Sequence, residues 1–279
     1  MDFPYLTQAK APLTCVVSAV NEFGEHISLS IPAERALTVY VDKCELVTLM
    51  TLGAQPELLV LGYLLNQRLI ICAGDIESIT VDWDVGAAAV KTCKGIENLD
   101  EKTARRVVTT GCGQGSVFGG LMDDVDNIRL PVHTSISQSQ LYALVNTIRL
   151  KETTYKSAGS VHACALFDST GNEPEMLIFV EDVGRHNAID TIAGWMAMHA
   201  KLHNESNRVF YTTGRLTSEM VIKSAQMGVP VVVSRSGITQ MGYQVAQSVG
   251  LCAIGRATNK RFACYTTTQR LVLQPDLAV

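Results

Sequence analysis

The second half of the chain alternates between short runs of β-type residues and longer runs with helical spacing. β-branched and apolar residues fill positions 161–167, 176–181, 209–213, 229–234 and 251–254. Apolar residues recur at helical spacing over 187–200, 218–227 and 239–249. Strands that alternate with helices lie side by side and parallel, with the helices packed on the faces of the sheet. We therefore predict an α/β fold for this half of the chain.

The first half predicts a smaller lobe of mixed structure. β-type runs at 37–41 and 44–52 flank Asp42-Lys43, which is a short hairpin signal. Pro56 opens a leucine-rich stretch with helical spacing, and 76–81 alternates like a strand. Residues 1 to about 30 look irregular, so we expect an extension there. The predicted division is an N-terminal extension with an α+β lobe at 1–100, followed by an α/β domain at 101–279.

Composition excludes several classes of protein. The eight cysteines include no Cys-x-x-Cys pair, and scattered thiols in a long chain are typical of a reduced cytoplasmic protein. The same spacing argues against a zinc site. A net charge of -4 argues against general nucleic-acid binding. We also expect no membrane segment, no signal peptide and a cytoplasmic location.

One cysteine has an unusual setting, within Gly111-Cys112-Gly113-Gln114-Gly115. The preceding run, 105–110, is typical of a short strand, so Cys112 would follow it on a glycine-rich loop. Glycines on both sides leave no bulky neighbour to bury the sulfur. The alternative is a tight turn in which the cysteine is a small buried hydrophobe. We favour an accessible and reactive thiol.

Polar and cationic residues follow the predicted strands, where ligands bind in open α/β sheets. The strand ending at Glu181 is followed by Asp182-Val183-Gly184-Arg185-His186-Asn187. Asp182 can cap the next helix. Arg185 and His186 in the first helical turn, however, oppose the helix dipole unless an anion binds there. A phosphate or carboxylate site explains this run better than a solvated helix start.

Two further strand ends repeat the pattern. Thr213-Gly214-Arg215 follows one strand and Ser234-Arg235-Ser236 follows the next. Glu219 and Lys223 form an i,i+4 pair on the intervening helix, so they belong to the scaffold. Arg215 has no such local explanation. Successive guanidinium and hydroxyl donors at one sheet edge favour a phosphorylated ligand.

A basic segment and a histidine have two interpretations each. Residues 256–261 place three cations after the last predicted strand. Without further context, a solvated loop explains this segment as well as a phosphate clamp does. His162 lies in an apolar run, where a single histidine is more often a satisfied core residue than a ligand.

Taken together, these runs resemble the formate dehydrogenase accessory sulfurtransferase family (FdhD/NarQ). The resemblance extends from roughly Glu34 to Leu271 and is strongest in the second half. The matching pieces are Glu181 to Ala188, Thr213-Gly214-Arg215 with Glu219 and Lys223, Gly228 before the strand ending at Ser234, Tyr265-Thr266 with Gln269-Arg270-Leu271, and, less specifically, Gly62-Tyr63.

The resemblance implies sulfur delivery. Members of the family accept a persulfide from a cysteine desulfurase and pass it to the molybdenum (or tungsten) bis(molybdopterin guanine dinucleotide) cofactor of formate dehydrogenase. It also implies a homodimer and a cytidine deaminase-like three-layer α/β/α sandwich with a smaller N-terminal lobe. Cys112 matches the persulfide carrier, which is the first cysteine of a Cys-x-x-Cys loop in the family. Residues 256–261 match the family's cofactor-binding stretch.

The chain departs from the family pattern in three places. Gly115 replaces the second loop cysteine, so the loop can carry a persulfide but cannot release sulfur by forming an internal disulfide. Residues 66–68 replace an acidic-glycine turn, and Thr191 replaces a lysine. The candidate cofactor-binding residues are His162, Asp182, Arg185, His186, Arg215, Ser234, Arg256, Ala257, Thr258, Asn259, Lys260 and Arg261.

Alternative functions remain at this point. Zinc deaminases need His-x-Glu and Pro-Cys-x-x-Cys, but Cys164 stands where the glutamate would follow His162, so deamination is disfavoured. A cofactor-binding chaperone without sulfur transfer and a nucleotide-binding protein of other purpose are also possible. Our preferred hypothesis is that the Cys112 thiolate accepts sulfur while the cationic strand ends hold the phosphates and guanine of the cofactor.

Overall fold

The computed structural model describes residues 3–96, 107–108, 115–116, 125–151, 153–199 and 207–278, and its fold is mixed α/β, as predicted. The main sheet has six strands in the order β12-β11-β13-β14-β15-β16. Its strands are β11 (His162–Asp168), β12 (Glu175–Asp182), β13 (Arg208–Thr212), β14 (Val231–Ser234), β15 (Cys252–Thr258) and β16 (Arg261–Cys264). The predicted parallel arrangement is confirmed for β13, β14 and β15, whereas β11, β12 and β16 pair in antiparallel fashion.

Helices cover both faces of this sheet. Helices α6 (Arg185–His199), α7 (Ser218–Gln226) and α8 (Gln240–Ser248) pack on one face, in a core that includes Leu166, Phe210 and Val232. Helix α4 (Gln138–Lys151) packs on the other face, against the alternate residues of the same strands, which include Phe167 and Tyr211. The short helix α5 (Thr154–Ala158) follows α4. None of the described helices is long and apolar enough to cross a bilayer.

The N-terminal lobe is a five-stranded sheet with one helix. Its strand order is β1-β6-β7-β4-β5, and a separate core packs between the sheet and α1. The elements are β1 (Tyr5–Leu6), β4 (Arg35–Val41), β5 (Cys44–Thr51), α1 (Pro56–Asn66), the 3-10 turn η1 (Ala73–Asp75), β6 (Ile76–Asp82) and β7 (Ala87–Thr92). The predicted turn at Asp42-Lys43 is confirmed, and both residues have positive φ angles, as a tight hairpin turn requires.

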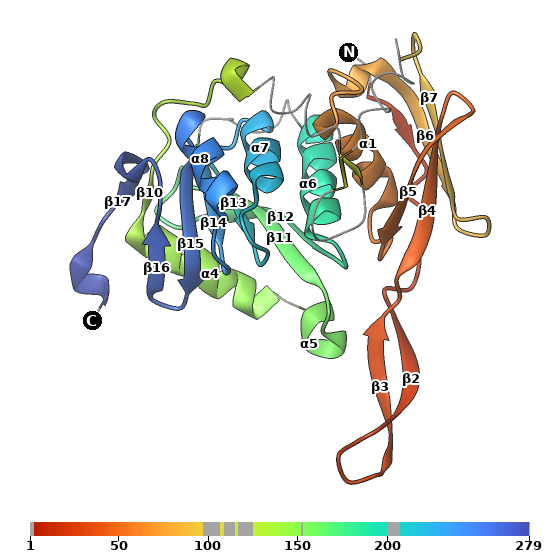
Figure 1. The fold of residues 1–279 in the computed structure, drawn as a ribbon, viewed down its shortest axis with the longest axis horizontal. Helices are drawn as coiled ribbons and strands as arrows, with labels where there is room; N and C mark the ends of the chain where they lie inside the picture. The colour runs from red at the N-terminus through yellow and green to blue at the C-terminus, as the bar shows by residue number, and fades with distance from the viewer. Residues whose placement is uncertain are drawn as a thin grey trace.

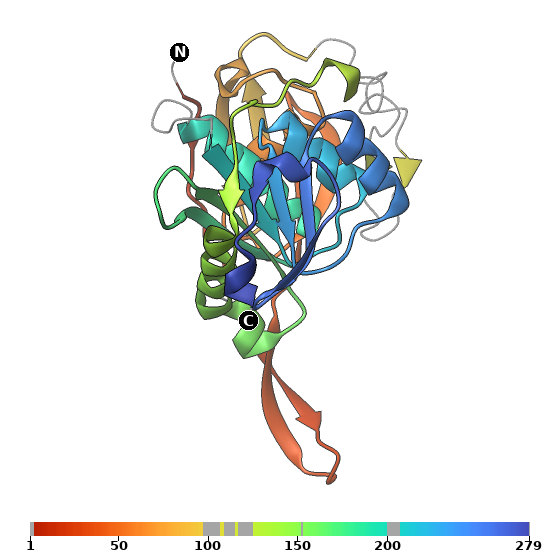
Figure 2. The same ribbon diagram turned by 90° about the vertical axis from the view of Figure 1, so that its left-hand side faces the viewer.

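The prediction of an irregular N-terminal extension is wrong. Strands β2 (Thr14–Val20) and β3 (His26–Pro32) form an antiparallel ribbon that projects from the body of the molecule (Figures 1 and 2). Apolar side chains such as Val16, Val20 and Leu29 are exposed on this ribbon. Ile27, Leu29 and Ile31 alternate with Ser28 and Ser30 in β3, so the strand signal was present there and was overlooked.

The two lobes meet where α1 lies beside α6 (Figure 1). Gly62 on α1 and Gly194 on α6 allow the helix backbones to touch. A Cβ atom built on Gly62 would lie 1.6 Å from the Asp190 carbonyl oxygen, and one on Gly194 would lie 2.0 Å from the Leu58 carbonyl oxygen. Any larger side chain at either position would therefore push the lobes apart.

Short elements complete the described chain. Strand β8 (Val107–Val108) pairs with β9 (Gly115–Ser116), and β10 (Ile136–Ser137) pairs with β17 (Leu271–Val272). The 3-10 turns are η2 (Val125–Asn127), η4 (Thr268–Arg270) and η5 (Pro275–Ala278). Val107 and Val108 lie within the strand predicted before the glycine-rich loop. Cys112 itself lies outside the described residues.

Candidate functional site

The predicted site residues converge on one edge of the six-stranded sheet. Strand pairing places His162 opposite Asp182, Cys164 opposite Thr212, and Thr212 opposite Ser234. The start of β11 and the ends of β12, β13 and β14 therefore share an edge, which we call the carboxyl edge. Helix α5 lies beside this edge at the lower end of the sheet in Figure 1.

Three guanidinium groups act electrostatically on His162 at the carboxyl edge. The pKa of His162 is lowered first by partial burial, which disfavours the charged ring, and then by repulsion from Arg185, Arg235 and Arg215. The histidine is therefore neutral near pH 7. A neutral imidazole beside these cationic side chains favours an anionic ligand.

Arg185 is a buried cation that lacks a full set of partners. It lies in the first turn of α6 with 4 % of its surface exposed, and among the described residues its Nε has no hydrogen-bond partner. Gly214 gives this side chain its space, because a Cβ atom there would lie 2.6 Å from Arg185 Cδ. A buried, unsatisfied N–H at a helix N-terminus is a favourable position for a phosphate or carboxylate oxygen.

His186 lies beneath the edge rather than on it. Its ring is buried, with Nδ1 3.4 Å from Glu219 Oε1, a contact that does not meet hydrogen-bond geometry. Its pKa is well below the ordinary value because burial disfavours the charged ring and because Lys223 and Arg185 repel a proton. His186 is therefore a neutral, buried residue that packs beneath the carboxyl edge.

A buried ionic network extends from the neighbourhood of His186 to α1. The predicted Glu219–Lys223 pair is confirmed at 3.6 Å, but it is buried rather than solvated. Lys223 also donates to Asp190 Oδ2 at 2.9 Å, and Asn66 donates to Asp190 Oδ1 at 2.6 Å. Burial raises the pKa of Asp190, and the nearby Lys223 opposes that rise. The network joins α1, α6 and α7 directly below the candidate site.

Two of the predicted ligands have internal partners instead. Asp182 accepts hydrogen bonds from Thr51 Oγ1 at 2.5 Å and Asn187 Nδ2 at 2.9 Å, as well as from backbone groups. Burial raises its pKa. Ser234 Oγ donates to the Gly214 carbonyl at 2.6 Å and accepts from a backbone N–H. These side chains hold the turns that carry the arginines, so their contribution to binding is positional.

The basic segment 256–261 forms a hairpin, because β16 follows it as a strand that the sequence pattern did not reveal. Arg256 is exposed, and its backbone N–H donates to the Ser236 carbonyl at 2.7 Å, which places it beside the turn after β14. Ala257 is buried and presents no side chain to a ligand. Thr258, Asn259, Lys260 and Arg261 are exposed at the hairpin. Tyr142 on α4 donates to the Lys260 carbonyl at 2.9 Å and holds the hairpin against that helix.

Comparison with known proteins identifies the family. The model of the FdhD/NarQ family matches residues 32–272. The chain belongs to this family. Among FdhD/NarQ members, a protein of Bacillus subtilis named sulfur carrier protein FdhD is 32% identical over 240 residues, which are 85% of this chain and 88% of that protein. A Wolinella succinogenes protein of the same name is 27% identical over 241 residues, covering 86% of this chain and 82% of the relative.

A solved structure supports the same fold. It is described as a formate dehydrogenase accessory protein from Desulfotalea psychrophila and superposes with a TM-score of 0.74. The alignment covers 94% of this chain and 100% of that chain, at 20% sequence identity. The α/β class and the FdhD/NarQ resemblance inferred from sequence are therefore confirmed. The more specific deaminase-like description stays a prediction.

The candidate site contains an aromatic residue that sequence reasoning missed. Tyr155 on α5 lies against Arg235, whose guanidinium carbon is 5.3 Å from the ring centroid. Glu181 holds α5 in place, because its carboxylate accepts from the backbone N–H groups of Thr154 and Tyr155 at 2.8 and 3.0 Å. Tyr155 is separated from the strand-end motifs in sequence, so no local pattern connects it with them.

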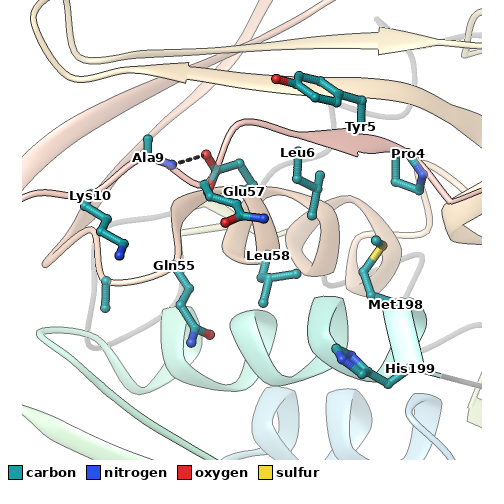
Figure 3. Close-up of a pocket in the computed structure, with 12 residues that line it drawn as sticks. Pro4, Tyr5, Leu6, Ala9, Lys10, Gln55, Glu57, Leu58, Met198 and His199 are labelled. Carbon is teal, nitrogen blue, oxygen red and sulfur yellow. Dashed lines mark hydrogen bonds between the residues drawn. The ribbon is translucent and has the colours of Figure 1, made fainter. Parts of the chain in front are cut away.

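A separate cavity lies away from the cations of the carboxyl edge. It has a volume of about 630 Å³ and lies between β1, the start of α1 and the end of α6 (Figure 3). Its lining is largely apolar, and Glu57 is occupied by hydrogen bonds from Thr7 Oγ1 and the Ala9 backbone. No group of three potential metal ligands occurs within the described parts of the chain. The carboxyl edge therefore remains the candidate site.

Proposed function

We propose that this FdhD/NarQ protein is a sulfur carrier that supports formate dehydrogenase maturation. Sulfur would pass from a cysteine desulfurase through Cys112 to a molybdenum or tungsten bis(molybdopterin guanine dinucleotide) bound as substrate. The observation that carries the proposal is the group of arginines around His162 at the carboxyl edge. The names of the relatives, which are called sulfur carrier proteins, support it.

The chemistry of the carboxyl edge fits the phosphates of such a cofactor. Arg185 offers a buried N–H that has no partner among the described residues. Arg215 and Arg256 are exposed nearby, on the turn after β13 and within β15. Guanidinium groups bind phosphate oxygens through paired, charge-assisted hydrogen bonds. The stacked Tyr155–Arg235 pair adds an aromatic surface beside these cations. A guanine dinucleotide combines the phosphates and the flat base that such a surface would bind.

Cys112 would act as the sulfur acceptor. Its thiolate would attack the outer sulfur of a desulfurase persulfide, forming a new S–S bond as the donor's S–S bond breaks and the donor thiolate leaves. Cys112 then holds one persulfide sulfur for transfer to the bound cofactor. We further propose that formate dehydrogenase and the desulfurase are partners and that the carrier acts as a homodimer.

Mass spectrometry tests the sulfur step directly. The full-length protein is incubated with a cysteine desulfurase and cysteine, and the tryptic peptide 107–129, which contains Cys112, is analysed without reduction. The proposal expects the mass of one added sulfur atom on that peptide. Cys112→Ala should lose the added sulfur and formate dehydrogenase maturation, whereas Cys93→Ala, which removes an exposed thiol elsewhere, should retain both. Full maturation by Cys112→Ala would refute the carrier role.

A cofactor-binding chaperone without sulfur chemistry is the second candidate. The observation that favours it is Gly115, which stands where the family resemblance expects a second loop cysteine. This alternative expects binding of guanosine diphosphate with unchanged mass of the Cys112 peptide after incubation with the desulfurase. Isothermal titration with guanosine diphosphate, compared with adenosine diphosphate, then shows whether the site prefers guanine.

A further inference from the structure

Two cysteines of the main sheet lie in sulfur contact. Cys252 Sγ on β15 is 3.7 Å from Cys264 Sγ on β16. Ile254 pairs directly with Cys264, and side chains two residues apart on a strand share one face of the sheet. Cys252 and Cys264 therefore point to the same face, which packs on α4. Both are reduced in this structure.

The environments of the two thiols differ. Cys252 is fully buried, whereas Cys264 is half-buried and accessible from solvent. The hydrogen bond between them lowers the pKa of Cys264 and, together with burial, raises the pKa of Cys252. A thiolate attacks a disulfide far faster than a thiol does, so the accessible Cys264 is the natural attacking group. Cys252 is in contact with Cys264, so it can attack the mixed disulfide that forms there.

We propose that Cys252 and Cys264 form a reversible redox pair that exchanges with small-molecule disulfides such as oxidised glutathione. The Cys264 thiolate attacks one glutathione sulfur, forms a mixed disulfide and releases glutathione as a thiolate. Cys252 then loses its proton and attacks Cys264 Sγ, which forms the Cys252–Cys264 bond and releases the second glutathione. Two protein thiols are oxidised, and one glutathione disulfide is reduced to two thiols.

Cys252 is diagonal to Cys264, because Cys264 pairs directly with Ile254, so the bond requires the two side chains to move toward each other. An S–S bond is about 2.0 Å long, so the two sulfur atoms must approach each other by less than 2 Å or so. The strands that carry them are already paired. The bond would fasten the base of the hairpin whose turn carries Asn259 and Lys260, and so would hold the basic segment 256–261 in one arrangement. Oxidation of the pair would thus control the arrangement of segment 256–261, independently of Cys112.

Tryptic mapping gives a direct test, because cleavage after Arg235, Arg256, Arg261 and Arg270 places the two thiols on separate peptides, 236–256 and 262–270. The full chain is incubated with oxidised glutathione, free thiols are blocked, and the protein is digested without reduction. The inference expects the two peptides to be joined by a disulfide and separated again by dithiothreitol. The exposed Cys44 and Cys93 serve as internal controls, which should carry only single glutathione adducts.

Two variants test the order of attack. In Cys252→Ser the reaction should stop at a glutathione adduct on Cys264, and in Cys264→Ser the buried Cys252 should stay unmodified. Separate adducts or unmodified thiols in the wild-type protein would overturn the proposal. Equal modification of Cys252 with and without Cys264 would also overturn it. These results do not depend on sulfur transfer, because the Cys112 peptide is scored independently.

Discussion

Thr51 and Asp182 are 131 residues apart in sequence, yet Thr51 Oγ1 donates a 2.5 Å hydrogen bond to Asp182 Oδ2. Thr51 ends β5 of the N-terminal lobe, and Asp182 ends β12 at the carboxyl edge. Asn187 strengthens the connection, because its amide donates both to Asp182 Oδ1 and to the Met50 carbonyl. Asp182, the second residue of the family-matching run from Glu181 to Ala188, therefore ties the two lobes together.

Thr51→Val should destabilise the protein by about 1–3 kcal/mol, because a buried carboxylate loses a hydrogen-bond donor. Urea unfolding followed by circular dichroism measures this loss. Thr48→Val is a matched control on the same strand, since the Thr48 hydroxyl meets only the Thr38 hydroxyl at the surface. The control should change stability by no more than about 0.5 kcal/mol. Equal effects of the two variants would contradict the assigned role of Asp182.

Gly62→Ala should lower the free energy of unfolding by about 1–3 kcal/mol or more through overpacking. The added methyl group would meet the backbone of Asp190, which cannot rotate away as a side chain could. Thermal unfolding of Gly62→Ala is compared with that of Gly171→Ala. A Cβ at Gly171 has its nearest neighbour at 3.5 Å, an ordinary contact. A stable Gly62→Ala protein would show that the helices can separate at little cost.

His186 should make the protein less stable as the pH falls below about 6.5. Its folded pKa lies well below the ordinary value, so above pH 6.5 the ring is neutral in both states and the full stability is present. Below that pH the unfolded state gains a proton first, and stability falls by about 1.4 kcal/mol per pH unit until the folded pKa is reached.

His186→Gln isolates this contribution. The raised pKa values of Asp182 and Asp190 act in the opposite direction, since the folded state then binds protons first as the pH falls. The difference between the urea stabilities of the wild type and His186→Gln, measured from pH 7.5 to about 5, removes these shared terms. A difference that does not vary with pH would rule out a buried neutral His186.

Arg215→Ala should weaken binding of guanosine diphosphate by roughly tenfold or more, as expected for loss of a hydrogen bond from a charged group. Arg215 is exposed, so its removal should leave the fold intact. Lys91→Ala is the control, because Lys91 is an exposed cation on β7 that pairs with Glu77. Isothermal titration at fixed salt measures both. Equal affinities for the two variants would place the phosphates elsewhere.

The local elements of the fold could be read from the sequence where periodicity was strong. Helices starting at Pro56 and Ser218 and the turn at Asp42-Lys43 have clear signals, and the structure has all of them. Strand β7 was missed because three of its six residues are alanine, which has low β-propensity. Strand β16 was missed because the cationic segment 256–261, which leads into it, suggested a loop.

The candidate site was predictable only in outline. Strand ends in an α/β sheet converge, so the gathering of Arg185 and Arg215 near one another followed from topology. Sequence could not show that Asp182 and Ser234 face inward, since their partners lie on distant segments. Nor could it place Tyr155 against Arg235. The predicted role of Cys112 stays a prediction, since that residue lies outside the described part of the chain.

The glycine contact between α1 and α6 limits how the protein can change shape. Helices whose backbones touch at Gly62 and Gly194 cannot slide or hinge at that point without losing the contact entirely. The Thr51–Asp182 bond fixes a second point of the same junction. A transfer cycle built on opening and closing of the lobes is therefore disfavoured, and the proposed sulfur transfer would have to take place with the two lobes in a fixed arrangement.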